Sequence, residues 1–378
     1  MPRKITLESA IVYIKWSLVL SLSWPLPITA TKWQIIRFKI LAVLSHINIV
    51  CFLVPLLILI QDCSDQRVVC IQSYPLICGC FHFWMSVGIC HIQYKRFQSL
   101  IAEMESYCKH ATDYEKTVLQ QYVDRCATFY AVVMISFYST TCVAISAPLF
   151  TSAPFPTYAK YPFDVNYQPL KTIIYAQQSL SGLQFSSMLC VSLLVALLLW
   201  FTTARFDILC NELRKALTVY ELIQCIQKHQ QLLRYANDVI ENVRFLVLTV
   251  VGANAISVIC TGAIFATRQP LIINVQFFLM TVISFCDVFT CCWPADSLLT
   301  ASSDIAQATY ESLWYYHNTD KQKNLIFILL KCRKPVILTV GCFIPILSLR
   351  YFSSYLSTGF SYMTTLHMMM TENNTNEV

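Results

Sequence analysis

The stretch Cys292-Trp293-Pro294-Ala295-Asp296 opens the C-terminal region from which the organisation of the whole chain can be worked out. Further along this region, Pro335 and Pro345 bracket nine residues, 336–344. A proline inside a helix removes one backbone hydrogen bond and bends the helix axis. The two prolines therefore predict that the last apolar region is a broken helix.

The segment after Pro345 is rich in hydroxyl side chains that recur at steps of three and four residues. This spacing places them on one face of a helix, and that face is too polar to lie against lipid. Small and hydroxylated residues are favoured where membrane helices pack closely, but polar groups also line water-filled pores. Both arrangements fit these residues: Ser354, Ser357, Thr358, Ser361 and Thr365.

Several motifs follow one another along the C-terminal region: Cys292-Trp293-Pro294-Ala295-Asp296, Ser302, Tyr310-Glu311, Trp314-Tyr315, Lys331-Cys332-Arg333-Lys334-Pro335 and Ser361-Tyr362-x-x-x-Leu366. Taken together, they resemble the signature of insect odorant receptors, most clearly over residues 293–366. The resemblance implies a tetrameric channel in which the final helix of each subunit lines a cation pore, with Gly359-Phe360 nearest the gate. It therefore favours the pore interpretation of the hydroxyl face.

The composition is that of a polytopic membrane protein, with 56% hydrophobic and 13% charged residues and a mean hydropathy of +0.54. A membrane helix needs about twenty mostly apolar residues. With the broken helix, the stretches of this kind predict an all-α membrane protein with seven transmembrane helices. The six that precede the broken helix are residues 35–60, 68–92, 127–150, 172–204, 244–266 and 270–293.

Lys and Arg concentrate before the first span and in the loops between spans two and three, four and five, and six and seven. The loops on the other side carry only Arg67, Lys160, Lys171 and Arg268. Because cytoplasmic loops are the basic ones, we expect a cytoplasmic N-terminus and an extracellular C-terminus. A G-protein-coupled receptor has the opposite orientation. The basic residues form no long run, so the net charge of +6 does not indicate nucleic-acid binding.

Residues 205–243 contain no proline or glycine, so the helices that flank this loop should continue into the cytoplasm. The family's shared co-receptor has a much longer insertion here, so this chain resembles a ligand-specific tuning subunit that pairs with the co-receptor in a heteromeric tetramer. The resemblance also implies an intracellular anchor between subunits that includes Tyr310, Trp314 and Pro335.

We therefore divide the chain into successive parts by their expected roles. They are a cytoplasmic or interfacial segment (1–34), spans one to six with the cytoplasmic extensions (35–293), the anchor segment (294–345), the pore-lining final helix (346–370) and an extracellular tail (371–378).

Two features near the N-terminus allow more than one interpretation. Residues 17–28 are apolar like a signal-peptide core, but Pro25 and Pro27 interrupt them, and Trp24-Pro25 matches a short element of the family, so we expect a retained segment. Cys63 and Cys70 flank the first external loop, where they either form a bridge or remain free thiols.

The resemblance implies a ligand pocket in the outer halves of spans two to six. Aromatic and thioether side chains suit a small volatile molecule, although each candidate also fits ordinary helix packing. The candidates are Phe81, Phe137, Tyr138, Thr141, Tyr175, Gln178, Ser179, Phe277, Phe278 and Met280.

Nothing in the sequence favours an enzyme, a cofactor or a metal site, because phosphate-loop and His-x-x-x-His motifs are lacking. Asp287 is the only acid well inside a span, and Arg350 is expected at a similar depth. A buried lone charge is costly, so we expect either that the two pair, within or between subunits, or that both face water.

These observations predict a subunit of a non-selective cation channel that a small volatile ligand opens, in the plasma membrane of sensory-neuron dendrites. Besides the co-receptor, its partners would be membrane lipid and the permeating cations. A gustatory receptor is the nearest alternative, but that family has a Thr-Tyr ending followed by Gln-Phe, which this chain lacks. A secondary transporter would have broken helices in both halves of the chain.

Overall fold

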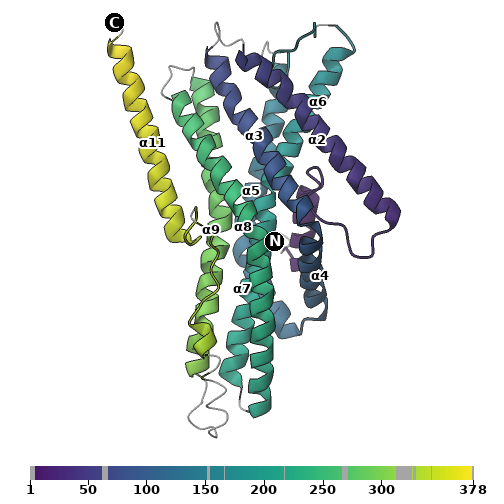
Figure 1. Cartoon of the computed structure of the whole chain (residues 1–378), viewed down its shortest axis with the longest axis vertical. Coiled ribbons are helices and arrows are strands. Elements are labelled where there is room, and N and C mark those ends of the chain that lie inside the picture. The colour runs from purple at the N-terminus through teal and green to yellow at the C-terminus, as the bar shows by residue number, and fades with distance from the viewer. Residues whose placement is uncertain are drawn as a thin grey trace.

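The computed structural model describes residues 5–61, 67–150, 154–165, 167–216, 218–265, 271–311, 326, 329–341 and 343–376. Within these ranges the chain is helical almost throughout, as Figure 1 shows. The helices are α1 (Leu7–Ser17), α2 (Lys32–Gln61), α3 (Arg67–Ile92), α4 (Tyr94–His110), α5 (Asp113–Phe150), α6 (Leu170–Leu189), α7 (Val191–Lys215), α8 (Val219–Phe265), α9 (Leu271–Glu311) and α11 (Leu349–Asn376).

Three long helices, α7, α8 and α9, form the centre of the molecule and contact one another pairwise. Helices α2, α3, α5 and α6 surround the upper part of this bundle, while α11 stands at the opposite edge against α8 and α9 (Figure 1). Apolar side chains of α7, α8 and α9 make up most of the main buried core. Within the described residues, the final helix thus makes extensive contacts with only two other helices, α8 and α9.

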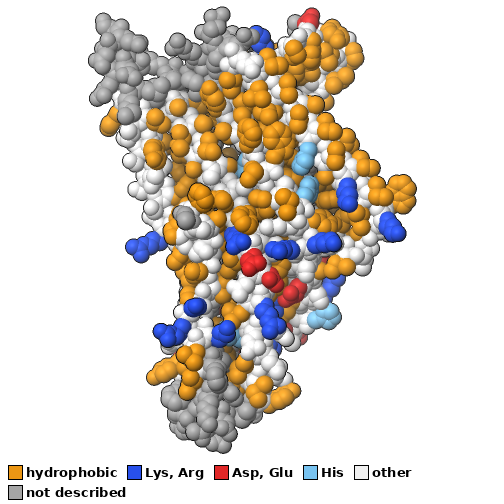
Figure 2. Space-filling model, in the orientation of Figure 1, with side chains coloured by type: hydrophobic (Ala, Val, Ile, Leu, Met, Phe, Trp, Pro, Cys, Tyr) orange, Lys and Arg blue, Asp and Glu red, His pale blue; other side chains and the backbone are white. Residues whose placement is uncertain are grey.

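Six helical segments of the described chain are long and apolar enough to cross a membrane, and they correspond to the six expected spans. The fourth is bent, because the chain leaves the helix at Cys190, between α6 and α7. Helix α11, with 28 residues, is the seventh membrane-length helix, which confirms the all-helical fold. On the face seen in Figure 2, hydrophobic side chains cover the upper half and most charged ones lie in the lower half.

The break before the final helix is a hairpin and not a short helix. Val340 donates its N–H to the carbonyl of Ile344 at 2.9 Å, and Ile344 donates back at 3.2 Å. Gly341 turns the chain with a φ of +48°, a conformation that glycine adopts without strain. Between its two prolines the backbone therefore satisfies its polar groups across the hairpin, and α11 begins at Leu349 instead of residue 346.

The segment after α1 is an integral part of the described fold. Leu18 and Ser21 are fully buried, and the Ser187 hydroxyl of α6 donates to the Ser17 carbonyl at 2.8 Å and accepts the Ser21 N–H at 2.9 Å. The Tyr138 hydroxyl of α5 also donates to the Ser17 carbonyl, at 2.7 Å. The chain between α1 and α2 thus packs into the bundle.

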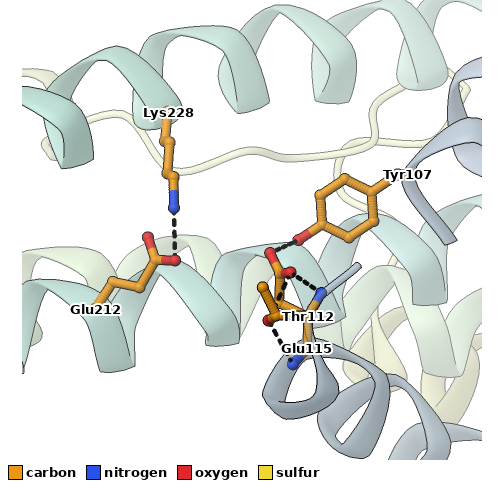
Figure 3. A network of polar contacts seen from close by, with 5 residues as sticks. All are labelled: Tyr107, Thr112, Glu115, Glu212 and Lys228. Atoms are coloured by element: carbon orange, nitrogen blue, oxygen red, sulfur yellow. Dashed lines mark hydrogen bonds and ion pairs between the residues drawn. The ribbon is translucent and has the colours of Figure 1, made fainter. Parts of the chain in front are cut away.

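At the lower end of the molecule, polar contacts fasten neighbouring helices to one another, as Figure 3 shows. Glu115 accepts hydrogen bonds from the N–H and hydroxyl of Thr112, at 2.7 and 2.8 Å, and so caps the first turn of α5. It also accepts one from Tyr107 of α4 at 2.7 Å. Lys228 of α8 pairs with Glu212 of α7 at 2.6 Å.

Helices α7 and α8 extend through the loop region that lacks proline and glycine, as expected. α7 ends at Lys215 and α8 begins at Val219. The apolar stripe of α8 in this region is buried within the chain, where Tyr235 packs on Phe201 of α7 with ring centroids 5.8 Å apart. This part of the molecule is therefore an intrasubunit helical hairpin. Its cytoplasmic location remains a prediction.

Candidate functional site

The hydroxyl face of α11 points away from its own bundle. Ser354, Ser357, Thr358, Ser361 and Thr365 are all exposed in the described chain. Thr358 and Thr365 donate their hydroxyls to the carbonyls four residues earlier, both at 2.9 Å, so these donors are satisfied by the helix itself. A packing seam within the subunit is therefore the wrong interpretation of this face, because no helix of the described chain covers it.

The opposite face of α11 packs against α8 and α9 through aromatic and sulfur-containing side chains. Tyr355 meets Phe285 of α9 edge-on with ring centroids 6.0 Å apart, and Phe352 meets Phe289 at 5.2 Å. Higher up, Met363 lies against Gly262 of α8. The helix is therefore amphipathic, with an apolar face packed on its own subunit and a hydroxyl face turned outward.

The two residues expected at the gate both lie against Phe285 of α9. Phe360 is 57% exposed and rests on Phe285 with ring centroids 5.5 Å apart. Gly359 faces the bundle, where an added Cβ would lie 3.2 Å from a ring carbon of Phe285 and 3.5 Å from Val258. Gly359 thus allows α11 and α9 to approach each other closely, a role that the sequence did not suggest.

Five of the expected ligand-binding residues lie on α5 and α6, and three of them take part in hydrogen bonds between these two helices. The Thr141 and Ser186 hydroxyls are 2.6 Å apart, and Ser186 donates to the carbonyl of Phe137 at 2.9 Å. Tyr175 donates to the carbonyl of Ile145 at 2.8 Å. The five are Phe137, Tyr138, Thr141, Tyr175 and Ser179, and the Ser179 hydroxyl donates to the carbonyl of Tyr175.

Gln178 is 2% exposed and binds the chain between α5 and α6. Its side-chain oxygen accepts hydrogen bonds from the N–H of Thr157 at 3.1 Å and from the Thr157 hydroxyl at 3.0 Å. Its amide nitrogen donates to the Tyr161 hydroxyl at 3.0 Å. The buried polar groups of Gln178 are therefore used to hold this upper loop in place, a role that could not be recognised without the loop's position.

The remaining ligand candidates are dispersed. Phe81 and Phe278 are 55% and 58% exposed on the outer surface, whereas Phe277 is buried in the bundle and Met280 is half-buried. Two pockets lie within the described residues, and none of the ten candidates lines either of them. One pocket, of about 120 Å³, is lined by α1, α4, α5 and α7, and the other, of about 320 Å³, lies at the lower ends of α5, α7 and α8.

Asp287 is fully buried and accepts a hydrogen bond from the Asn254 amide of α8 at 2.7 Å. Arg350 is exposed, and no ion pair joins it to Asp287 in the described chain. The expectations that the two residues pair within one subunit and that Asp287 faces water are therefore wrong. Pairing between subunits is the alternative that remains. Asn254 was missed from the sequence, although a lone amide inside a span is a signal that could have found it.

The anchor candidates are only partly described. Tyr310 is 64% exposed near the end of α9, Pro335 is half-buried, and Trp314 lies outside the described residues. Cys63 also lies outside them, so a bridge to Cys70 and two free thiols both stay as alternatives. Next to Pro335, Val336 donates its N–H to the Ser302 hydroxyl of α9 at 3.0 Å. Ser302 thus fastens the hairpin to α9.

The structure as a whole is similar to solved insect olfactory receptors. It matches OR5 from Machilis hrabei in complex with eugenol with a TM-score of 0.79, over 95% of this chain and 98% of that one, at 14% sequence identity. A second structure of the same receptor matches with the same TM-score, at 15% identity. These likenesses define the fold as that of a multi-pass, all-helical olfactory receptor.

The sequence comparisons define the family. The family model of the 7tm odorant receptors matches residues 68–360. The chain is 26% identical to Odorant receptor 10 of Aedes albopictus over 149 residues, 39% of each chain. It is 31% identical to Odorant receptor 30a of Drosophila melanogaster over 115 residues, 29% of this chain and 30% of that one.

The protein belongs to the insect odorant receptor family. It is a multi-pass membrane receptor and not an enzyme. Its alignments to curated relatives cover well under half of their length; for Odorant receptor Or2 of Anopheles gambiae the share is 38%, at 25% identity.

Proposed function

We propose that this chain is the ligand-specific subunit of a non-selective cation channel that a small volatile molecule opens. In this proposal it assembles with a co-receptor into a heteromeric tetramer in the plasma membrane of sensory-neuron dendrites. The observation that carries the proposal is the hydroxyl face of α11, which is exposed on the side away from its own bundle. A face of this polarity needs water or another polar surface beside it within a membrane.

The chemistry of this face fits weak selectivity among cations. It carries hydroxyls and no carboxylates between Ser354 and Thr365, so it can replace part of the hydration shell of a cation without the strong field of an acidic ring. Since Thr358 and Thr365 donate to their own helix, their oxygens retain lone pairs that can accept from water or face a cation.

The ligand site is proposed between α3, α5, α6 and α9, which are the helices that carry the ten candidates. The similarity to OR5 of Machilis hrabei, which was solved in complex with eugenol, supports a small organic ligand here too. Binding would favour one of two arrangements of these helices by its differential affinity, and α11 would then move away from the pore axis. The lower helical hairpin and the end of α9 would form the cytoplasmic anchor.

The first test is whole-cell current in cells that express this chain alone or with the co-receptor, challenged with a panel of volatile compounds. We expect fast cation current only in the presence of the co-receptor. Current from this chain alone would contradict the tuning-subunit assignment, and a response that requires G proteins would contradict the channel proposal.

The pore assignment is tested separately by cysteine accessibility. We expect Ser357→Cys and Ser361→Cys to be modified by a charged, membrane-impermeant thiol reagent during ligand application, with a loss of current. The matched control is Met363→Cys on the same helix, which lies against Gly262 and should not react. Equal reaction at all three positions, or at the control alone, would remove the proposed pore face.

A further inference from the structure

Two cysteine side chains from distant parts of the sequence meet where α3 packs on α8. The thiols of Cys78 on α3 and Cys260 on α8 share a hydrogen bond. Both side chains are half-buried, and neither forms a disulfide in the structure. The sulfur atoms of a disulfide lie about 2.05 Å apart, so two thiols that are already in contact need only a small approach to form one.

The contact belongs to an extensive interface between the two helices. α3 contacts α8 more than any other helix of the described chain, and the Ser86 and Thr249 hydroxyls lie 2.9 Å apart farther along it. Cys80 follows Cys78 by two residues, about 200° around the helix, and is buried in a separate core cluster. The interface therefore presents Cys78, and not Cys80, to Cys260.

We propose that Cys78 and Cys260 are a redox-sensitive pair that forms an intrasubunit disulfide with hydrogen peroxide as the oxidant. One thiol sulfur attacks the peroxide, whose O–O bond breaks, and a sulfenic acid and one water form. The second sulfur then attacks the sulfenic sulfur; the S–S bond forms as the S–O bond breaks, and the second thiol's proton leaves with the hydroxide as water. The two sulfurs lose two electrons, which reduce one peroxide to two waters.

The placement of the pair favours the disulfide over other oxidation products. A thiol in apolar surroundings forms little thiolate, so the first step is slow. The second step is fast, because the two sulfur atoms are already in contact. The sulfenic acid is therefore captured before peroxide oxidises it further. Cys142 of α5 is exposed, and within the described residues no second thiol contacts it, so it should not form a bridge in this way.

A bridge at this place would hold α8 on the side away from the final helix. Gly262 follows Cys260 by two residues and lies against Met363 of α11, so α8 has α3 on one side and α11 on another. The disulfide favours the arrangement of α3 and α8 described here over any in which the two thiols separate. Its effect on the channel rests on the proposed function, whereas the bridge itself does not.

The test treats the full-length protein in phospholipid vesicles with increasing hydrogen peroxide until Cys142 is oxidised. Free thiols are then alkylated, monomers are isolated on a non-reducing gel, and their digest is analysed by mass spectrometry. We expect a pair of peptides linked through Cys78 and Cys260, which a reductant separates. Recovery of both as alkylated thiols, their conversion to sulfinic acids without a link, or a link found only between subunits would overturn the proposal.

Two variants should lose the link and two should keep it. Cys78→Ser and Cys260→Ser each remove one sulfur, and the remaining cysteine should be recovered alkylated. Cys80→Ser and Cys142→Ser are the matched controls, and the amount of linked peptide should not change in either. Loss of the link in Cys80→Ser would contradict the assignment of Cys78 as the partner. Gel filtration and surface expression establish that each variant folds.

The effect on opening is measured in cells that also express the co-receptor. After peroxide treatment we expect half-maximal current to need about threefold more ligand, with recovery after a reductant and no change in Cys260→Ser. An unchanged response with the link present would overturn the effect on opening and leave the disulfide established. Absence of ligand-evoked current in untreated cells would refute the proposed function and not the bridge.

Discussion

Replacing Gly359 by alanine tests whether α11 moves against α9 when the proposed channel opens. In the structure a Cβ at this position would lie 3.2 and 3.3 Å from two ring carbons of Phe285 and 3.5 Å from Val258. The hydroxyl face points away from α8 and α9, so movement of α11 away from the pore axis is movement toward these helices. A methyl group at Gly359 should therefore oppose opening more than it strains the structure described here.

The magnitude follows from the closeness of the contact. Overpacking by one or a few methylene groups costs about 1–3 kcal/mol in well-packed regions. If the open arrangement bears about 1 kcal/mol more of this cost than the closed one, the opening equilibrium shifts about fivefold, since 1.4 kcal/mol corresponds to a factor of ten. We therefore expect Gly359→Ala to need about five times more ligand for half-maximal current.

The assay is a concentration–response series in cells that also express the co-receptor, with the most effective volatile from the panel. The matched control is Gly252→Ala in α8, where no atom lies within 4 Å of the added Cβ. Both glycines are helical, so both substitutions gain similarly in helix propensity. An unchanged or higher sensitivity of Gly359→Ala, at equal surface expression, would refute the proposed direction of movement.

Three further predictions concern other contacts. Ser187→Ala leaves the buried Ser21 N–H without its acceptor and should lower the free energy of unfolding by about 1–3 kcal/mol, measured by thermal unfolding in detergent. Because Arg350 is exposed and Asp287 is not, the double charge reversal should not restore the current that the reversal at Asp287 removes; recovery would indicate pairing between subunits. Burial of the Tyr107 hydroxyl and its hydrogen bond to the Glu115 carboxylate raise the pKa of Tyr107 above its ordinary value of 10.0. The protonated hydroxyl therefore contributes its full stability below pH 10, and that contribution falls only at higher pH. Tyr107→Phe should therefore lower the unfolding temperature equally at pH 6 and pH 9.

The sequence predicted the helices well, because the length and hydropathy of a membrane span are local properties. The six expected spans and a break in the last helix near Pro335 and Pro345 needed no knowledge of tertiary contacts. The conformation of the segment between the prolines, by contrast, depends on tertiary contacts. Val336, Leu338 and Val340 are buried, and the chain there is fixed by a hairpin and by the Ser302 hydroxyl, which no periodicity reveals.

Side-chain roles were harder to predict, because helix spacing gives a face but not its neighbour. The spacing of the hydroxyls on α11 did identify one face, and the structure leaves that face open. By contrast, Phe81 and Phe277 could not be distinguished from sequence, although one is 55% exposed and the other 5%. Asp287 was recognised as costly, but its partner Asn254 lies 33 residues away on another helix, beyond the reach of any local pattern.

The packing of α8 suggests how a ligand could act on α11. On one side α8 contacts α3, where the Ser86 and Thr249 hydroxyls are 2.9 Å apart. On another side it contacts α11, where Gly262 lies against Met363. A ligand that changes the position of α3 therefore shifts an element that already touches the final helix. Since α11 otherwise rests chiefly on α9, the proposed mechanism has the α8 and α9 pair convert binding energy into movement of the hydroxyl face.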